Sequence, residues 1–318
     1  METNLKFRPL HFNWVAIHPR PIGVVHFIGG AFFGTFPTIF YRYILRQLYQ
    51  QGYTIVVLPF RFTFRHWSVA ISLVRGRERL RQAIIAEAKR LGYESQIYEE
   101  EPISSNPNHF WLAHSLGCKY IALLELLTEL EHRETREFLG NCAGAKQAAD
   151  IENSLKDVDF KEISLKNQPS ILLAPVISGI ESAIPIPAFA NLIKNLGLDV
   201  QPTVKQTRCL INKSSLFGLT AAIAFAKDKI ASNPDIGDDG EPKGTVEWLQ
   251  KHVPAIIFSK LPNRGHFAPL GFHFGDRQLA DEIINLLKME TRQLEQLKTG
   301  VSQNVAGKSP QKLGVKQS

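Results

Sequence analysis

The segment WLAHSLG, residues 111–117, constrains the fold more than any other part of the sequence. The apolar residues that end at Ala113 predict a β-strand, and the residues after Ser115 have the apolar periodicity of a helix. A small residue stands two positions before Ser115 and a glycine two positions after it, so a strand and a helix can meet there in a sharp, strained turn. Such a turn lifts the serine hydroxyl above the sheet and aims the backbone N–H of Leu116 at a reacting oxygen. The alternative is an ordinary strand-to-helix turn in which Ser115 caps the helix.

Strands and helices are predicted to alternate along most of the chain. Strands are predicted at residues 24–28, 54–59, 110–113, 170–176, 206–212 and 255–260, and helices at 37–51, 68–91, 118–133, 216–231 and 276–298. This alternation is typical of an α/β fold with a mainly parallel sheet and helices on both faces. In such sheets, ligands and chemistry gather at the carboxyl ends of the strands. Ser115 follows one of these ends, which makes it a candidate nucleophile.

The chain has 318 residues, of which 44% are hydrophobic, and this is enough to bury one large core. We expect a single domain over residues 1–298, with lids or insertions at 140–168 and 213–250. The first of these segments is predicted to be irregular, and the second includes an Ala-rich stretch, 216–231, that would form a helical lid. From residue 299 the composition predicts a disordered tail.

The net charge of +7 suits anionic partners such as acidic lipid, but nothing in the sequence resembles a nucleic-acid-binding module. No apolar run reaches the length of a membrane-spanning helix, so any membrane contact is expected to be peripheral. The N-terminus lacks the apolar core of a secretory signal. Cys118, Cys142 and Cys209 have no paired spacing, which argues against a disulfide framework and a structural zinc site and favours a reducing, cytoplasmic location.

Two further segments at predicted strand ends complete the expected site. The glycine loop after the first strand, residues 29–34, would supply a second N–H donor, from Gly30 or Ala31. It fits neither glycine fingerprint for phosphate binding, and we expect no cofactor or metal. His266 follows the last predicted strand, where a general base can reach the nucleophile. The alternative for residues 29–34 is a glycine turn that is required only for packing. The alternative for His266 is a histidine with a purely structural role.

The acid of such a site is missing from its usual place. In α/β folds of this kind the nucleophilic serine, the acid and the histidine follow one another in the chain, and the acid comes after the strand before the last one. The predicted strand 206–212 ends at Asn212 and is followed by Lys213 and Ser214, so no carboxylate stands there. The first two substitutes are Glu181, beyond the preceding strand, and Asn212, which would orient the imidazole without charge. The acidic loop offers three more: Asp235, Asp238 and Asp239. A further alternative is that no acid is present.

Four blocks of the chain are similar to one known family. They lie within residues 20–290 and read VVHFIGGAFFGTFPTIFYRYILRQLYQQGYTIVVLPF, WLAHSLGCKY, SAIPIP and LPNRGHFAPLG. On these blocks the chain resembles an uncharacterised family of cyanobacteria and plant plastids, the domain of unknown function 1350. The resemblance implies an α/β-hydrolase fold and a hydrolase activity without an established substrate. It also implies Ser115 as the nucleophile and His266 as the base.

The chain departs from the family at Arg65, and at Lys213 and Ser214, where the family tends to carry aspartates. These departures motivate a second hypothesis, a catalytically silent hydrolase fold that binds a lipid, a pigment or a protein partner. The leading hypothesis is a serine hydrolase that cleaves a carboxylic ester, from a small-molecule ester or a lipid with an apolar acyl or prenyl moiety. Its substrate would contact aromatic and cationic side chains near the strand ends: Phe32, Phe33, Arg61, Arg65 and Trp67. The alternative is that the aromatic residues belong to the core and the arginines to the solvated surface.

Overall fold

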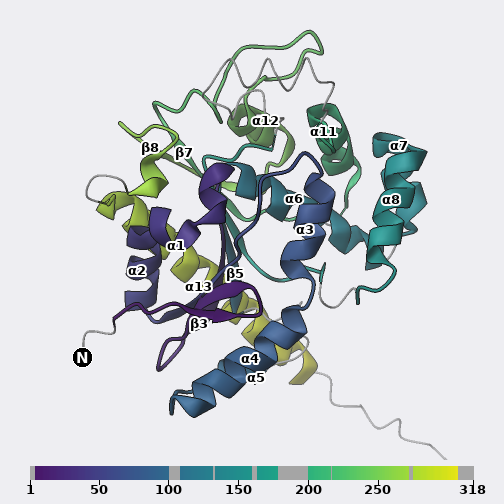
Figure 1. Ribbon diagram of the computed structural model, residues 1–318. Coiled ribbons are helices and arrows are strands. Elements are labelled where there is room, and N and C mark those ends of the chain that lie inside the picture. Colours follow the sequence, from purple (N-terminus) through teal and green to yellow (C-terminus); the bar gives the residue numbers. More distant parts are fainter. Residues whose placement is uncertain are drawn as a thin grey trace, which may run out of the picture.

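A computed structural model shows the chain folded around one large sheet (Figure 1). It describes residues 4–99, 108–131, 133–159, 163–177, 200–215, 217–271 and 275–306. The sheet has eight strands, in the spatial order β1 (Arg8–Leu10), β2 (Asn13–Ala16), β4 (Tyr53–Val57), β3 (Gly23–Ile28), β5 (His109–His114), β6 (Ser170–Leu173), β7 (Ala221–Phe225) and β8 (Ile257–Leu261). The strands β1 and β2 pair antiparallel, and the strands from β4 to β8 run parallel. The carboxyl ends of the parallel strands therefore share one edge of the sheet.

Apart from β8 at the edge of the sheet, the parallel strands are buried on both faces, and their alternate side chains enter two separate cores. In β3, for example, Val24 and Ile28 join one core, whereas Val25 and Phe27 join the other. Burial on both faces explains why these strands are continuous apolar runs, rich in β-branched and aromatic residues, rather than alternating apolar and polar ones.

Helices cover both faces of the sheet. One face carries η1 (Phe32–Thr35), α1 (Pro37–Phe40), α2 (Arg42–Gln50), η5 (Ala268–Leu270) and α13 (Arg277–Ala306). The other face carries α3 (His66–Val74), α4 (Arg77–Arg90), α5 (Gln96–Glu99), α6 (Leu116–Thr128), η3 (Glu129–Glu131), α7 (Thr135–Ala143), α8 (Ala145–Leu155), α11 (Val204–Lys213) and α12 (Thr245–His252). The predicted arrangement, a mainly parallel sheet between two helical layers, is confirmed.

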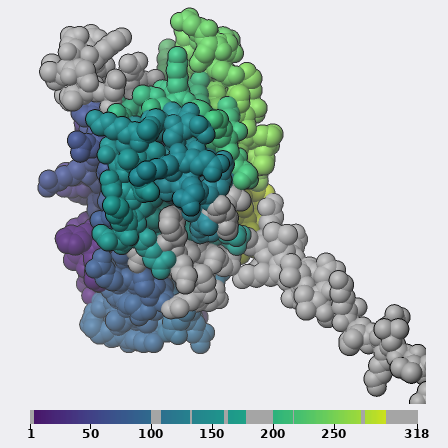
Figure 2. Space-filling model, turned by 90° about the vertical axis from the view of Figure 1, so that its right-hand side faces the viewer, coloured from purple at the N-terminus to yellow at the C-terminus, as the bar shows by residue number. Residues whose placement is uncertain are grey.

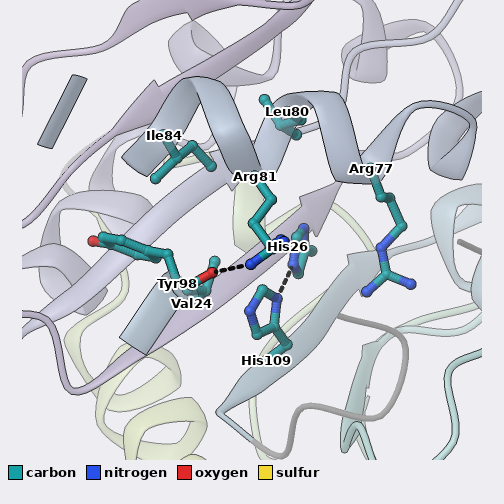
Figure 3. Close-up of a pocket in the computed structure, with 8 residues that line it drawn as sticks. All are labelled: Val24, His26, Arg77, Leu80, Arg81, Ile84, Tyr98 and His109. Atoms are coloured by element: carbon teal, nitrogen blue, oxygen red, sulfur yellow. Dashed lines mark hydrogen bonds between the residues drawn. The ribbon is translucent and has the colours of Figure 1, made fainter. Parts of the chain in front are cut away.

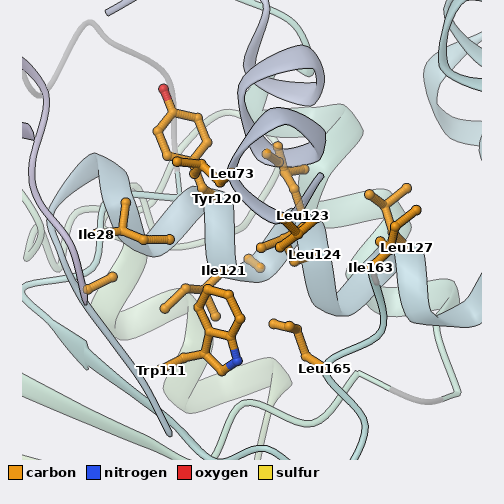
Figure 4. Close-up of a cluster of buried hydrophobic side chains, with 14 of the residues drawn as sticks. Ile28, Leu73, Trp111, Tyr120, Ile121, Leu123, Leu124, Leu127, Ile163 and Leu165 are labelled. Atoms are coloured by element: carbon orange, nitrogen blue, oxygen red, sulfur yellow. The ribbon is translucent and has the colours of Figure 1, made fainter. Parts of the chain in front are cut away.

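The helix α6 is buried along its whole length. On one side its apolar side chains face the sheet, where Trp111 of β5 lies beneath Ile121 (Figure 4). On its other side α6 contacts α3, which in turn contacts α8. The helices α7 and α8 form much of the outer surface on this side (Figure 2). Because α6 is enclosed between the sheet and these helices, its N-terminus is held in a fixed position at the carboxyl edge of β5.

Most predicted elements are present, with bounds that differ by a few residues. The predicted helix at 68–91 is divided into α3 and α4, because Gly76 between them adopts a φ of +80°. The segment 140–168, predicted to be irregular, contains the end of α7 and all of α8. The short hairpin formed by β1 and β2 is not indicated by the sequence pattern.

Two predictions in the second half of the chain are wrong. Residues 206–212 form part of the helix α11 rather than a strand, and Thr203 and Gln206 form a capping box at its start. The predicted helical lid at 216–231 contains the strand β7, which is buried between β6 and β8. The sequence of β7, AAIAF, has high helix propensity, but burial in the centre of a sheet outweighs this weak preference.

A disulfide joins Cys142 of α7 to Cys209 of α11, and this contradicts the prediction from the cysteine pattern. The two cysteines are 67 residues apart in the chain and meet because the two helices pack together, which local spacing does not indicate. Cys118 is free and buried. The cysteine pattern therefore gives no support for a reducing compartment.

The last helix, α13, extends to Ala306, beyond the predicted end of the domain at residue 298. The remainder of the predicted tail, residues 307–318, lies outside the described residues. Of the helices that the structure describes, none combines the length and the apolar character needed to cross a bilayer.

Candidate active site

Ser115 lies at the turn between β5 and α6. Its backbone has a φ of 53° and a ψ of −120°, a conformation that non-glycine residues rarely adopt. Three hydrogen bonds hold this strained backbone. Its N–H donates to the carbonyl of Leu173 at 3.0 Å, and its own carbonyl accepts from the N–H groups of Val176 at 3.2 Å and Cys118 at 3.1 Å. The side chain stands at the N-terminus of α6, and only 5% of the residue is exposed.

The helix α6 and the end of β3 approach each other closely at Gly117. A Cβ atom added at Gly117 would lie 2.5 Å from the carbonyl oxygen of Gly29 and 2.6 Å from that of Ile28. Gly30 is also confined, because an added Cβ there would lie 3.1 Å from the Cβ of Ser115. The backbone packing around the serine therefore leaves no room for a side chain at Gly117.

His266 belongs to the loop that follows β8, and its imidazole reaches Ser115. The distance from Nε2 to the Ser115 Oγ is 2.8 Å, and the distance from Nδ1 to Oδ2 of Asp228 is 2.9 Å. Because a carboxylate can only accept, the imidazole carries its hydrogen on Nδ1, and Nε2 accepts from the serine hydroxyl. Arg264, which pairs with Asp276 at 2.8 Å, anchors this loop to the start of α13.

Asp228 is the site residue that the sequence predictions do not include. Its Oδ1 accepts backbone N–H groups from Ile230 at 2.7 Å and Ala231 at 3.0 Å. Burial acts to raise the pKa of Asp228, but the hydrogen bond and charge of His266, with the two N–H groups, outweigh burial and lower the pKa below its usual value. The carboxyl group is therefore ionised at neutral pH and faces the imidazole with a full negative charge.

The misassigned strand explains why Asp228 was missed. Asp228 follows β7, the strand before the last one in the chain, which is where an acid belongs in this chain order. The prediction places a strand at 206–212 instead, and so searches for the acid after Asn212 rather than after Phe225. A signal was present, since an apolar run of strand length, residues 221–226, ends two residues before an aspartate.

The predicted substitutes for the acid do not reach His266 in the part of the chain that the structure describes. Asn212 is exposed on α11, and both ring nitrogens of His266 are engaged by Ser115 and Asp228, so Asn212 does not orient the imidazole. Three aspartates are exposed in the loop between β7 and α12: Asp235, Asp238 and Asp239. Glu181 lies outside the described residues. Lys213 and Ser214 end α11, so their departure from the family pattern does not affect the position after β7.

One of the two predicted loop donors is already engaged. The N–H of Gly30 donates to the hydroxyl of Tyr41 at 2.7 Å, so Gly30 is not available to a substrate oxygen. The next residue, Ala31, precedes η1, and Leu116 begins α6. Within the described chain, the N–H groups of Ala31 and Leu116 have no hydrogen-bond acceptor. These two groups are thus backbone donors without an acceptor, one at the N-terminus of α6 and one directly after the glycine loop.

A buried hydrogen-bond chain connects the parts of the site. The Tyr41 hydroxyl, which accepts from Gly30, donates to Nδ1 of His114 at 2.9 Å. Nε2 of His114 donates to the backbone carbonyl of His266 at 2.9 Å. Since that carbonyl can only accept, the direction of every bond in the chain is fixed. Burial, aided by the charge of His266, lowers the pKa of His114 to about 3, so His114 stays neutral.

The predicted aromatic contacts are partly at the site. Phe32 and Phe33 belong to η1, directly after the glycine loop, and Phe33 packs edge-on against Phe267 at 6.0 Å between ring centroids. Trp67 is a correction, because it is 4% exposed within the core of the other helical layer, and its Nε1 donates to Gln147 of α8 at 3.3 Å. A residue at the start of a helix that follows a strand can either pack in the core or line a pocket, and the apolar periodicity of the sequence does not distinguish these two positions.

The two predicted arginines are exposed. Arg61 follows Phe60, whose N–H donates to the carbonyl of Gly34 at 3.1 Å, so Arg61 lies beside the segment that carries η1. Arg65 precedes α3 and forms an isolated bridge with Gln201. Neither arginine forms an ion pair with another described residue.

A separate small cavity lies at the opposite ends of β3 and β5, beneath α4 (Figure 3). It has room for about one water molecule and is lined by Val24, His26, Arg77, Leu80, Arg81, Ile84, Tyr98 and His109. His26 and His109 are hydrogen-bonded at 2.8 Å, and burial, with the charges of the arginines, lowers the pKa of His109 to about 3. This cavity is distant from Ser115, and we assign it no part in the site.

Among the described residues, no cluster of three or more potential ligands could hold a metal ion.

The model of a protein family described as "Protein of unknown function (DUF1350)" matches residues 6–271. The chain belongs to this family. No curated protein matches the DUF1350 chain in sequence. Among solved structures, the phosphonate-inhibited esterase B from Lactobacillus rhamnosis is 13% identical, with a TM-score of 0.53 over 90% of this chain and 83% of the other. A thermophilic esterase from Thermogutta terrifontis is 16% identical, with a TM-score of 0.47 over 93% and 94% of the two chains. The first likeness shows the fold, and the DUF1350 chain has the predicted α/β-hydrolase fold.

Proposed function

We propose that this DUF1350 protein is a serine hydrolase that cleaves carboxylic esters. The observation that carries the proposal is the continuous hydrogen-bond chain from Ser115 through His266 to Asp228, with contacts of 2.8 and 2.9 Å. The three residues follow β5, β8 and β7, so the chain order is serine, acid, histidine. The same constellation activates a serine nucleophile on unrelated folds.

In the first step, Ser115 Oγ forms a bond to the carbonyl carbon of the ester, and Nε2 of His266 takes the hydroxyl proton. The π electrons of the carbonyl move to its oxygen, which becomes a tetrahedral oxyanion. Asp228 stabilises the positive imidazolium, because its own pKa is low enough to keep it ionised.

The N–H groups of Ala31 and Leu116 would bind the oxyanion. Neither has an acceptor in the described chain, and the N-terminus of α6 adds positive potential at Ser115. This replaces the predicted choice between Gly30 and Ala31, since the N–H of Gly30 is bound to Tyr41.

The intermediate then collapses. The bond from the carbonyl carbon to the alkoxy oxygen breaks, and the leaving alcohol takes the proton from His266, which leaves an ester between Ser115 and the acyl group. A water molecule gives a proton to His266 and attacks this ester, and the acid is released with Ser115 reprotonated.

The acyl or alcohol portion of the substrate is expected to be apolar. The aromatic residues next to the site support this: Phe267 follows the histidine directly, with 5.3 Å between their ring centroids, and Phe33 contacts Phe267. The silent-fold hypothesis loses one of the two departures that motivated it, because Asp228 fills the position where Lys213 stood in the prediction, whereas the departure at Arg65 stands.

Hydrolysis of p-nitrophenyl butyrate and p-nitrophenyl palmitate tests the proposal. Replacing the nucleophile, Ser115→Ala, should reduce kcat by at least about a thousandfold, and Asp228→Asn should reduce it by roughly 10³ to 10⁴. The exposed residue Asn212 is the control, so Asn212→Ala should leave kcat unchanged. Circular dichroism verifies that each variant is folded. The proposal is wrong if folded wild-type protein hydrolyses neither ester faster than Ser115→Ala.

A further inference from the structure

Four large apolar side chains are exposed around the candidate site. The exposed fractions are 46% for Phe32, 58% for Phe36, 68% for Ile39 and 41% for Phe267. We call these four residues the apolar rim. Three of them come from the segment that holds η1 and α1, directly after the glycine loop, and the fourth follows His266. Folded proteins rarely expose a group of large apolar side chains without a partner for it.

The apolar rim is one structure rather than scattered side chains. Phe33 contacts both Phe40 and Phe267, with centroid distances of 5.1 and 6.0 Å, and so connects the segment after β3 to the loop after β8. Phe32 stacks on Phe62 at 5.1 Å. The ring contacts therefore place the rim at the carboxyl edge of the sheet, on both sides of the glycine loop and His266.

The backbone beneath the rim is fixed. The N–H of Gly34 donates to the carbonyl of Gly30 at 2.6 Å, and the carbonyl of Gly34 accepts from Phe60 at 3.1 Å. Thr35 donates from its hydroxyl to the carbonyl of Phe60 at 3.2 Å. The exposed side chains are thus presented by a hydrogen-bonded loop, and their exposure does not reflect a frayed segment.

A further exposed aromatic residue lies at the same edge. Trp14 of β2 pairs with Val57, the last residue of β4, in an antiparallel register. The turn between β1 and β2, with Phe12 at its tip, therefore lies at the carboxyl edge of β4. Phe12 is 99% exposed.

The part of the sequence that supplies most of the rim is rich in cations. Residues 3–77, which supply the rim segment and the strands beside it, contain no aspartate or glutamate. The cationic residues in this stretch are Lys6, Arg8, Arg20, Arg42, Arg46, Arg61, Arg65, Arg75 and Arg77. Lys227 and Lys229, on either side of Asp228, are exposed as well.

Two cations close to the rim in the sequence, Arg42 and Arg61, are available for a partner. Arg42 stands three residues after Ile39, and Arg61 precedes Phe62, which stacks on Phe32. Both are exposed, and neither forms an ion pair within the part of the chain that the structure describes. An anionic surface with an apolar interior would satisfy both the cations and the apolar side chains.

We propose that the apolar rim and its flanking arginines bind the surface of a membrane that contains anionic phospholipid. The apolar side chains enter the headgroup region, and the arginines contact the phosphates. Nucleic acid is a poorer fit, because most of the exposed side chains at this edge are aliphatic or phenyl groups on short, rigid turns rather than a continuous cationic groove. The rim lies beside Ser115 and His266 at the carboxyl edge of the sheet, so docking would place the candidate site next to the lipid. Membrane binding itself does not depend on catalysis by Ser115.

Co-sedimentation of the full chain with sucrose-loaded vesicles tests this proposal. Vesicles of equal parts phosphatidylcholine and phosphatidylglycerol should bind the wild type, and vesicles of phosphatidylcholine alone should bind it less, with binding weakened by salt. The double substitution Phe36→Ser and Ile39→Ser should weaken binding by about tenfold or more. Ser115→Ala should bind as the wild type does, which separates this proposal from the proposed hydrolysis.

The matched control is Ile22→Ser. Ile22 is 54% exposed, comparable to Ile39, but it precedes β3 and lies at the opposite edge of the sheet. This variant should bind vesicles as the wild type does, and thermal melting shows that all variants are folded. The proposal fails if wild-type protein does not sediment with anionic vesicles, or if Ile22→Ser reduces binding as much as the rim variant. It also fails if sedimentation shows that the rim substitutions dissociate a dimer, since a second copy of the chain then covers the surface.

Discussion

A single glycine determines how closely β3 can approach the helix that follows Ser115. The carbonyl oxygens of Ile28 and Gly29 would lie within 2.6 Å of a Cβ at Gly117, and both belong to backbone that cannot move without breaking the sheet. We therefore predict that Gly117→Ala lowers the free energy of unfolding by about 3 kcal/mol or more, measured by urea denaturation.

Gly140→Ala provides the comparison for this substitution. Gly140 lies in the interior of α7, and an added Cβ there meets no atom within 4 Å. The same chemical change should therefore raise the free energy of unfolding by about 0.5 to 1 kcal/mol, because alanine favours the helix. Equal effects of the two substitutions would contradict the close approach at Gly117.

At the scale of elements, the hydrogen-bond chain through Tyr41 and His114 joins the start of α2, the end of β5 and the loop after β8. Tyr41→Phe removes the acceptor of the Gly30 N–H and the donor to His114. We expect it to lower kcat for ester hydrolysis by about tenfold with little change in KM, because the glycine loop acts on the transition state.

Tyr98→Phe is the control that separates positioning from stability. The Tyr98 hydroxyl is also buried and lies 2.6 Å from the hydroxyl of Thr54, but at the other end of the sheet. Both substitutions should cost about 1 to 3 kcal/mol in stability, measured by thermal melting. Only Tyr41→Phe should change kcat, and a similar loss of kcat in both variants would assign Tyr41 a purely structural role.

The elements also show how far sequence reasoning reaches. The strands β3, β4, β5 and β8 were predictable because they are short apolar runs bounded by turn residues, and Ser115 and His266 were located from their ends. The strand β7 was not, because alanines favour a helix locally and only the neighbouring strands make this run a strand. Asp228 was missed for the same reason. The disulfide and the engagement of Gly30 by Tyr41 depend on packing between distant segments, which no local pattern records.

At the scale of the whole molecule, stability should depend on the protonation of one buried carboxyl group. Burial raises the pKa of Glu125 in α6 from 4.5 to about 8, against a hydrogen bond from Gly218 that acts to lower it. The folded protein therefore keeps the proton through neutral pH, whereas the unfolded chain loses it near pH 4.5. Stability is fully present below the unfolded pKa and is lost as the pH rises toward 8, by up to about 1.4 kcal/mol per pH unit.

Glu125→Gln should remove this pH dependence. Between pH 5 and 7, the difference in the free energy of unfolding between the variant and the wild type should grow steadily in favour of the variant. Urea denaturation at several pH values measures it. A constant difference across this range would show that Glu125 is ionised in the folded protein.

The catalytic claim is tested most directly by reaction with a fluorophosphonate, followed by mass spectrometry of the labelled peptides. A serine activated by His266 and Asp228 forms a covalent phosphonate ester, whereas an ordinary surface serine does not react at a comparable rate. We predict one label per folded wild-type chain, on Ser115, with no label on Ser115→Ala and much slower labelling of Asp228→Asn. A folded wild-type protein that stays unlabelled, or a Ser115→Ala variant that labels as fast as the wild type, would contradict the claim.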